Sequence, residues 1–418
     1  MQTRRLHVHR PVILLFLAAL ALRLLCAVVV KGVIIPRRIF PAYYFGDTKE
    51  YQTGAFELLK NGIFSPVHGY SGGHVWYMRI EAFFYTIFGP HTLVMMAVNA
   101  SLSAAVIFLI YKMGLFLFNN KIALSACALY AVYPSLIFFS SLNLRDPWIA
   151  FFSLLACTSV LAIMNEESRL LWIPVFFFSL LTASLLRPQT ALFFLVTIVL
   201  LSVWLLAVKK FGQAINSAAL IISCWVIYKL TTLPFISVPD IYPATPAKPV
   251  AVPVPAPAHY KLMAKVMEFR YGFLYANEHT GIPPATLLYP GWRFHSIPGL
   301  VLMEIKLVLS VLFLPLPFIY PDGGRIARVF QGIENTAFIA AFILFALGLY
   351  AAVKAGKNRA PHLFTFIYLA VFIGIFSFFC PDLGSATRYK LQYIPLMLPF
   401  MAMGWDIISG MLRKRAAR

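Results

Sequence analysis

The chain has 418 residues and a formal net charge of +20, yet only 12% of its residues are charged and 61% are hydrophobic. A soluble globular domain carries about 25% charged residues, so this composition excludes one. It predicts an all-α, polytopic integral membrane protein that contacts membrane lipids. The net charge does not indicate a nucleic-acid partner, because basic residues of membrane proteins gather in cytoplasmic loops and near lipid headgroups.

Apolar segments long enough to span a bilayer divide the chain. A spanning helix needs about 20 apolar residues. A stretch at 299–319 contains Leu314-Pro315-Leu316-Pro317 and is predicted to be re-entrant or interfacial. The predicted spans, about ten, are 11–31, 91–111, 121–140, 147–164, 170–186, 189–208, 213–231, 334–353, 361–380 and 391–411. The first has no convincing cleavage site and is expected to be retained.

Basic clusters predict the orientation. Placing all of them in the cytoplasm requires an even number of spans, so both termini are expected there and 299–319 is expected not to cross. The clusters are Arg4 with Arg5 and Arg10, Lys209 with Lys210, Lys354 with Lys357 and Arg359, and Arg413 to Arg418.

Three regions follow from this pattern. Residues 1–231 form a transmembrane core that includes a first outer loop at 32–90, and residues 334–418 form the C-terminal spans. Between them, 232–333 is an outer region. It begins with a proline-rich linker at 234–257, continues with an expected interfacial helix at 259–277, and ends with the re-entrant segment.

The first outer loop contains a short polar helix. Asp47 to Gly62 is expected to be helical, with Asp47 in its first turn and Gly62 as its stop. A carboxylate at a helix N-terminus stays ionised. Asp47 is therefore either only an N-cap or a carboxylate used in chemistry. The expected buried face comprises Tyr51, Ala55, Leu58 and Leu59.

Other polar stretches fall on the same predicted side of the membrane. They hold His74, Arg79 and Glu81 in the first loop, Arg145-Asp146-Pro147 before one span, Arg187 after another, and Arg388-Tyr389-Lys390 before the last. Such a convergence of carboxylates, guanidinium groups and aromatic rings predicts a binding or catalytic site. The sequence shows neither a glycine-rich phosphate loop nor a His and Cys metal cluster.

Several short motifs, in order along nearly the whole chain, carry a family resemblance. They are Asp47, Tyr51 and Gly62, then Phe88-Gly89, Leu129 to Ser135, Arg145-Asp146-Pro147, and Arg388-Tyr389 with Pro395. In these the chain resembles the GT-C class of membrane glycosyltransferases, especially relatives of protein mannosyltransferases and of the aminoarabinose transferase. The resemblance implies a sugar donor linked to polyprenyl phosphate and a lipid, glycan or protein acceptor, as in cell-envelope glycan assembly or protein glycosylation.

The chemistry of such a transfer assigns expected roles. A carboxylate must take the proton of the acceptor hydroxyl, and Asp47 is the expected general base, with Asp146 and Glu50 as further catalytic candidates. Fixed cations must meet the charge of the leaving phosphate. The candidates for these are Arg388, Lys390, Arg187 and Arg145, and those for other substrate contacts are Tyr51, His74 and Tyr389.

Alternatives remain open at this point. Asp146 could instead orient a guanidinium group, cap its helix before Pro147, or share a divalent metal such as Mg²⁺ or Mn²⁺ with Asp47. The rival functions are a polymerase or ligase of polyprenyl-diphosphate-linked glycans, with Arg270 or Arg293 essential, and a lipid flippase or transporter. The expected location is the bacterial inner membrane, with the site on its non-cytoplasmic side.

Overall fold

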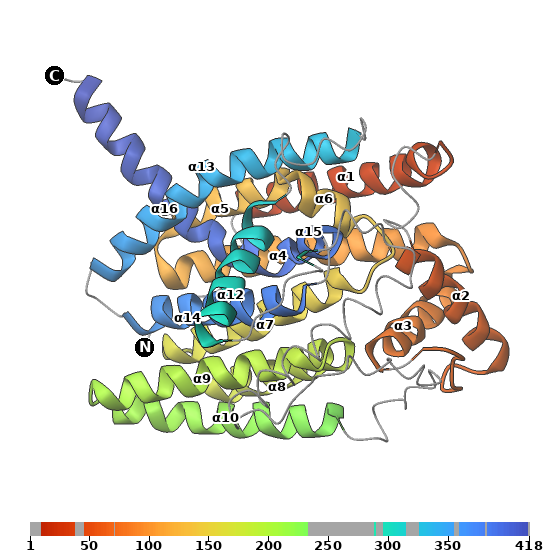
Figure 1. Cartoon of the computed structure of the whole chain (residues 1–418), viewed down its shortest axis with the longest axis horizontal. Coiled ribbons are helices and arrows are strands. Elements are labelled where there is room, and N and C mark those ends of the chain that lie inside the picture. The colour runs from red at the N-terminus through yellow and green to blue at the C-terminus, as the bar shows by residue number, and fades with distance from the viewer. Residues whose placement is uncertain are drawn as a thin grey trace.

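The structure is a computed structural model, and every regular element in the part it describes is a helix (Figure 1). Most of these helices run alongside one another in a bundle. The proline-rich linker, the expected interfacial helix, Arg270 and Arg293 lie outside the described residues. The described residues are 10–37, 46–70, 72–232, 288–289, 296–314, 326–354, 359–380 and 383–416.

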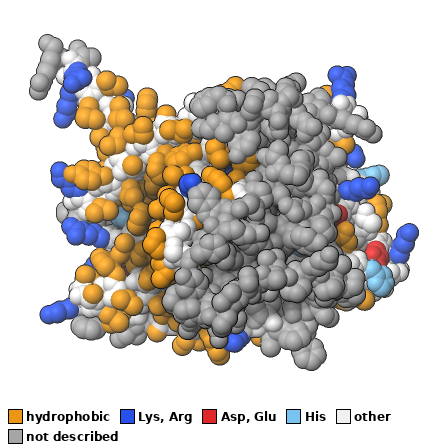
Figure 2. All heavy atoms as spheres, viewed as in Figure 1, with side chains coloured by type: hydrophobic (Ala, Val, Ile, Leu, Met, Phe, Trp, Pro, Cys, Tyr) orange, Lys and Arg blue, Asp and Glu red, His pale blue; other side chains and the backbone are white. Residues whose placement is uncertain are grey.

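In the part of the chain that the structure describes, eight helices are long and apolar enough to cross a membrane. Figure 2 shows apolar side chains covering much of the described surface between groups of basic side chains. This confirms an all-α, polytopic membrane protein. The eight helices are α1 (Arg10–Val29, continued by the π-helical turn η1, Val30–Ile34), α4 (Thr92–Leu117), α7 (Asp146–Met164), α8 (Arg169–Leu186), α9 (Gln189–Ala207), α13 (Ile326–Lys354), α14 (Arg359–Phe379) and α16 (Lys390–Ala416).

The two other predicted spans are also helical but less regular. The predicted span 213–231 lies in α10 (Phe211–Thr232), whose apolar stretch Ser217–Thr232 is short. The predicted span 121–140 is broken into α5 (Asn120–Val132) and α6 (Pro134–Ser140), which meet at a bend of 60°. Pro134 causes the break, because proline disfavours a helical conformation in the residue before it, and Tyr133 is extended.

Of the segment 299–319, the structure describes residues 299–314, which are helical up to Phe313. Helix α12 (Ile297–Phe313) ends before Leu314, as expected of a residue that precedes a proline. Figure 1 shows α12 inclined to α7 and α14 and lying in front of them. That the segment 299–319 does not cross the bilayer stays a prediction.

Two short helices from 32–90, the predicted first outer loop, lie at one end of the bundle. These are α2 (Gly46–Asn61) and α3 (Gly72–Phe88), and α16 ends at the opposite end (Figure 1). The predicted helix from Asp47 is confirmed, and it stops at Gly62, whose φ of +103° favours glycine. Tyr51, Ala55 and Leu58 are buried as expected, but Leu59 is 37% exposed.

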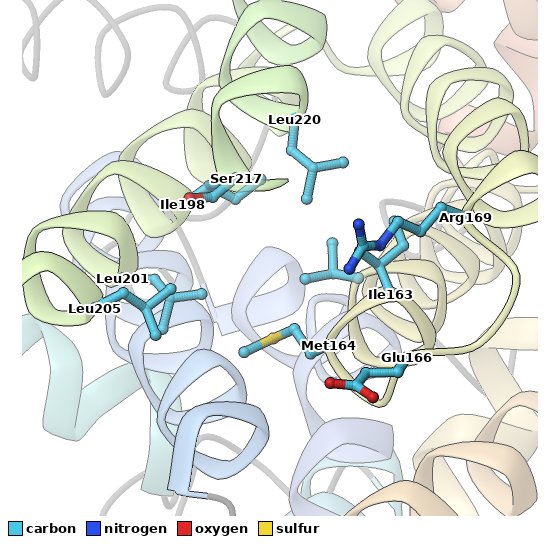
Figure 3. A pocket seen from close by; sticks show the side chains of 10 residues that line it. Ile163, Met164, Glu166, Arg169, Ile198, Leu201, Leu205, Ser217 and Leu220 are labelled. Carbon is cyan, nitrogen blue, oxygen red and sulfur yellow. The ribbon is translucent and has the colours of Figure 1, made fainter. Parts of the chain in front are cut away.

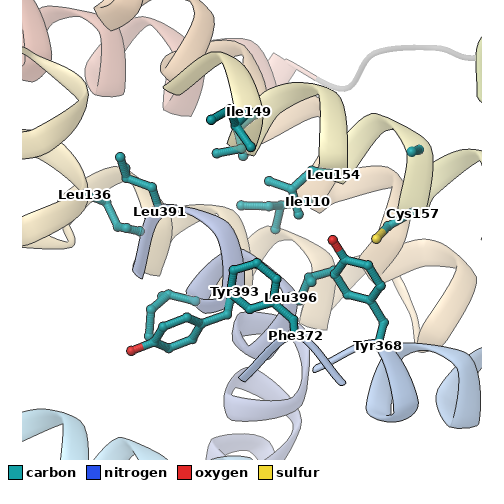
Figure 4. Packing of buried hydrophobic residues seen from close by; sticks show 14 of the residues in the cluster. Ile110, Leu136, Ile149, Leu154, Cys157, Tyr368, Phe372, Leu391, Tyr393 and Leu396 are labelled. Carbon is teal, nitrogen blue, oxygen red and sulfur yellow. The ribbon is translucent and has the colours of Figure 1, made fainter. Parts of the chain in front are cut away.

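Close packing holds the bundle together. Buried side chains from α4, α6, α7, α14 and α16 meet in its centre, among them Leu154, Phe372 and Tyr393 (Figure 4). Helices α13 and α16 cross at two glycines. A Cβ at Gly348 would lie 1.9 Å from the Phe400 oxygen, and one at Gly404 would lie 2.0 Å from the Leu344 oxygen. Small residues at such crossings let membrane helices approach closely.

A buried arginine joins the first span to its neighbours. Arg23 of α1 is fully buried, and its guanidinium group donates to the Ser103 hydroxyl at 3.1 Å and to the backbone oxygens of Ala19 and Tyr130 at 3.2 and 3.4 Å. Its guanidinium carbon also lies 4.7 Å from the centroid of the Tyr130 ring. Arg23 therefore fixes α1 against α4 and α5.

Candidate functional site

A carboxylate and a guanidinium group meet where the first outer loop reaches the last span. Asp47 in the first turn of α2 forms an ion pair with Arg388, which ends the short helix α15 (Leu383–Arg388). Among the described interactions, the Asp47 carboxylate accepts a hydrogen bond from the Arg388 guanidinium group and none from a backbone N–H of α2. Burial raises the pKa of Asp47, but the charge and hydrogen bond of Arg388 outweigh it and lower the pKa below its ordinary value. Asp47 is therefore ionised at neutral pH, and its side chain remains 36% exposed.

A second ion pair lies between α7 and α8. Arg187 Nη2 donates to Asp146 Oδ1 at 3.1 Å, and the two side chains are only 10% and 5% exposed. Asp146 is the first residue of α7, so the structure uses it to orient a guanidinium group. Arg187 Nη1 is buried and has no hydrogen-bond partner among the described residues. This pair therefore retains a donor for a ligand oxygen.

Aromatic rings cover the guanidinium group of Arg187. Its carbon lies 5.0 Å from the ring centroid of Tyr389 and 5.3 Å from that of Phe376. The two rings are in edge contact, with centroids 3.7 Å apart. Such faces hold a cation in place while leaving its N–H edge free to bind an anion.

Arg145 lies where α3 touches the end of α8. Its Nη1 donates to the Leu186 oxygen at 3.2 Å. A Cβ at Gly73 of α3 would lie 1.9 Å from that oxygen and 2.9 Å from Arg145 Nη1. The position therefore requires glycine, because any side chain would push α3 away from the arginine.

His74 lies one residue further along α3, with aromatic neighbours on the outer loop. Its ring centroid is 5.6 Å from that of Tyr51 and 6.4 Å from that of Tyr70. The positive charge of Arg145, then burial, lower the pKa of His74 to about 3, although Asp47 opposes them. His74 is therefore neutral, and its Nδ1 is buried without a hydrogen-bond partner in the described structure.

Two of the predicted residues stand apart from this group. Glu50 is largely exposed on α2, and the partial loss of water around its carboxyl group, followed by the negative charge of nearby Asp47, raises its pKa. Lys390 is 1% exposed and turns toward α13, where it contacts Asn335 and lies 3.3 Å from Glu334. The structure thus brings Asp47, Arg388, Arg145 and His74 into one electrostatic group. The contacts of Arg187 with Asp146 and Tyr389 lie beside this group, whereas Lys390 is already paired with Glu334.

Sequence reasoning did not assign a network behind the site. Asn99 of α4 donates to the Tyr77 hydroxyl at 3.0 Å and accepts from Trp148 Nε1 at 2.9 Å. Asn143 and Glu81 continue the network. The available signal was an asparagine in the middle of an apolar span, because a polar side chain there needs partners.

The described residues do not fit a metal ion at this place. No group of three His, Cys, Asp or Glu side chains among them could hold one. Asp47 and Asp146 are instead paired with Arg388 and Arg187, whose positive charges occupy the place of a cation.

A cavity of 40 Å³ lies elsewhere in the bundle (Figure 3). It is lined by residues near Met164 of α7 and Ser217 of α10. Met164 lies 18 residues beyond Asp146, which is about 27 Å along a helix. This cavity is remote from the two ion pairs.

The helical membrane core, with two further helices between the first span and the next, has a fold that is known from solved structures. Solved structures of the oligosaccharyltransferase of Archaeoglobus fulgidus share this fold. The apo form has a TM-score of 0.53 and 14% identity, and the match covers 96% of this chain and 51% of that chain.

The same enzyme, AglB, in complex with an inhibitory peptide and a dolichol-phosphate, has a TM-score of 0.54 and 13% identity, with 96% and 51% of the two chains covered. The chain thus spans about half the length of these enzymes. No family model matches the sequence, and no curated protein matches it.

Proposed function

We propose that the protein transfers a sugar from a polyprenyl-phosphate donor to a lipid, glycan or protein acceptor on the non-cytoplasmic side of a bacterial inner membrane, with both termini in the cytoplasm. The observation that carries this proposal is the ion pair of Asp47 and Arg388, beside the buried Arg187. The fold, shared with an enzyme solved in complex with a dolichol-phosphate, supports a lipid-linked donor.

In the proposed reaction, Asp47 is the general base. The acceptor oxygen attacks the anomeric carbon while its proton passes to the Asp47 carboxylate. The bond from that carbon to the phosphate oxygen breaks, and its electron pair leaves with the polyprenyl phosphate. The configuration at the carbon is inverted.

The guanidinium groups balance the charge of the leaving phosphate. Arg388 and Arg145 lie around Asp47, and Arg187 offers its unpaired Nη1 from the side of Tyr389. Arginine suits this role because its planar fork matches phosphate oxygens. Lys390 is matched by Glu334, so in this proposal it supports the start of α16.

Because Arg388 pairs with Asp47 and is also proposed to bind the donor phosphate, the donor is expected to bind before the acceptor is deprotonated. In the free protein its charge lowers the pKa of Asp47, which weakens Asp47 as a base. A donor phosphate that takes hydrogen bonds from Arg388 reduces this effect, and the pKa of Asp47 rises. Donor binding therefore activates the base that the acceptor needs.

The test is Asp47→Asn in the full-length protein, purified in detergent and supplied with polyprenyl-phosphate-linked sugars. Asparagine keeps the size and a hydrogen-bond acceptor but cannot take a proton, so transfer should fall by roughly two to four orders of magnitude. Binding of polyprenyl phosphate should survive in this variant and weaken in Arg388→Ala and Arg187→Ala.

Glu57→Gln is the matched control, because Glu57 lies on the same helix outside the site. It should leave transfer unchanged. If Asp47→Asn transferred sugar at a near wild-type rate, Asp47 would not be the general base, and Asp146 or Glu50 would have to take that role. The same result with Arg270 or Arg293 essential would indicate a glycan polymerase or ligase.

A further inference from the structure

A fully buried carboxylate lies on α3, on the same side of the helix as His74. Glu81 Oε1 accepts a hydrogen bond from the Tyr85 hydroxyl at 2.5 Å and another from Asn143 Nδ2 at 2.7 Å. Its second oxygen, Oε2, is buried and has no hydrogen-bond partner among the described residues. The described ion pairs include none with Glu81. Burying a carboxylate without a cation is costly, so its presence calls for a role beyond filling space in the core.

The network of Glu81 holds the segment 141–146 at several points. Asn143 Oδ1 also accepts from the Tyr77 hydroxyl at 2.8 Å. Asn99 Nδ2 donates to the backbone oxygens of Leu142 at 2.7 Å and of Leu144 at 2.9 Å. Side chains of α3 thus hold the segment through its Asn143 side chain, and Asn99 of α4 holds it through two backbone oxygens of the segment.

This segment carries two residues of the site. Arg145 reaches the Leu186 oxygen, and Asp146 accepts from Arg187. We propose that Glu81 is a positioning residue: through Asn143 it fixes the segment 141–146, and so it places Arg145 and, through the Asp146 carboxylate, Arg187 for binding of the donor phosphate. This inference rests on the proposed function, and Glu81 itself acts only through its neighbours.

Glu81 is the group in this network whose charge changes with pH near neutrality. The groups that face it are the Tyr77 and Tyr85 hydroxyls of α3, the Asn143 amide of the segment and, through Tyr77, the Asn99 amide of α4. None of them changes charge near neutral pH. Burial raises the pKa of Glu81 to about 7, although the hydrogen bonds from Tyr85 and Asn143 lower it. Because hydrogen bonds to an ionised carboxylate are the stronger ones, the segment is held more tightly above this pH.

The test exchanges the carboxylate and the amide. Glu81→Gln removes the charge, and Asn143→Asp places a second carboxylate beside Glu81. The double variant Glu81→Gln with Asn143→Asp restores one carboxylate and one amide in reversed positions. Hydrogen exchange of the backbone amides of 141–146, measured in the full-length protein, reports the segment independently of turnover. We expect exchange about tenfold faster in Glu81→Gln, a larger increase in Asn143→Asp, and recovery to within about threefold of wild type in the double variant.

Donor kinetics provide the second measurement. The KM for the polyprenyl-phosphate-linked sugar should rise about tenfold in Glu81→Gln, and the change of KM with pH near 7 seen in the wild type should disappear. The control Glu57→Gln should change neither measurement. Unchanged exchange and KM in Glu81→Gln, or a double variant no better than Asn143→Asp, would overturn the positioning role. Hydrogen exchange could respond as expected although the protein uses no polyprenyl-phosphate-linked donor. That outcome would support the fixing of the segment 141–146 by Glu81 and would refute the proposed function.

Discussion

The variant Asp146→Asn separates the buried ion pair from the rest of the site. At 3.1 Å between Arg187 Nη2 and Asp146 Oδ1, the attraction at an effective dielectric constant of about 20 is ~5 kcal/mol. Desolvation offsets part of it, and removing one partner of a buried pair costs about 3–5 kcal/mol. The rings of Phe376 and Tyr389 still stabilise the guanidinium group. We therefore expect a loss near the lower end, about 3 kcal/mol.

A double-mutant cycle measures this interaction directly. Asp146→Asn, Arg187→Gln and the double variant would be unfolded by SDS titration in mixed micelles. The double variant leaves no unpaired charge, so its loss should be smaller than that of Asp146→Asn, with a coupling energy of about 2 kcal/mol. Binding of polyprenyl phosphate should be weak in both variants that lack Arg187.

The partly exposed ion pair of Lys112 and Glu167 provides the control. Lys112 and Glu167 lie 2.9 Å apart, and Glu167 is 38% exposed. Glu167→Gln should cost less than about 1 kcal/mol and leave donor binding unchanged. Our reasoning about the buried pair would be refuted if Asp146→Asn unfolded within about 0.5 kcal/mol of wild type and the cycle showed no coupling.

Two further predictions follow from the same region. Gly73→Ala should reduce donor turnover at least tenfold, because its Cβ would displace the Leu186 oxygen or Arg145. Gly410→Ala in α16, where a Cβ meets open space, should not reduce it; radiolabelled sugar transfer would show the difference. The stability of the protein should change little between pH 4.5 and 6.5, because two groups oppose each other. The lowered pKa of His74 makes stability rise with pH there, and the raised pKa of Glu81 makes it fall, each by up to ~1.4 kcal/mol per pH unit. SDS unfolding of His74→Gln and Glu81→Gln should therefore show opposite slopes, and parallel curves would contradict both assignments.

The sequence predicts the spans well because hydropathy over about 20 residues depends on local composition alone. It also predicts the helix that ends at Gly62, since glycine is a local stop signal. The bend between α5 and α6 was signalled by Pro134, but a proline inside an apolar stretch fits a kink as well as a break.

The candidate site was predicted only in its parts. Asp47 and Arg388 are 341 residues apart, and no local pattern states that they form a pair. Lys390 follows Arg388 by two residues, but the turn into α16 directs it toward α13 instead of the site. Glu81 was noted only beside Arg79, because the partner that gives it meaning, Asn143, lies 62 residues further along the chain.

The buried Arg23 has a consequence for biogenesis. Its partners Ser103 and Tyr130 are made 80 and 107 residues after it, so the first span enters the translocon before these two contacts can form. An arginine at the centre of an inserting helix costs about 2.5–3.5 kcal/mol on the translocon scale. The many apolar neighbours of Arg23 in α1 offset this cost during insertion. The first segment therefore completes its assembly only when α4 and α5 emerge from the ribosome, which makes the early bundle of α1, α4 and α5 a cotranslational folding unit.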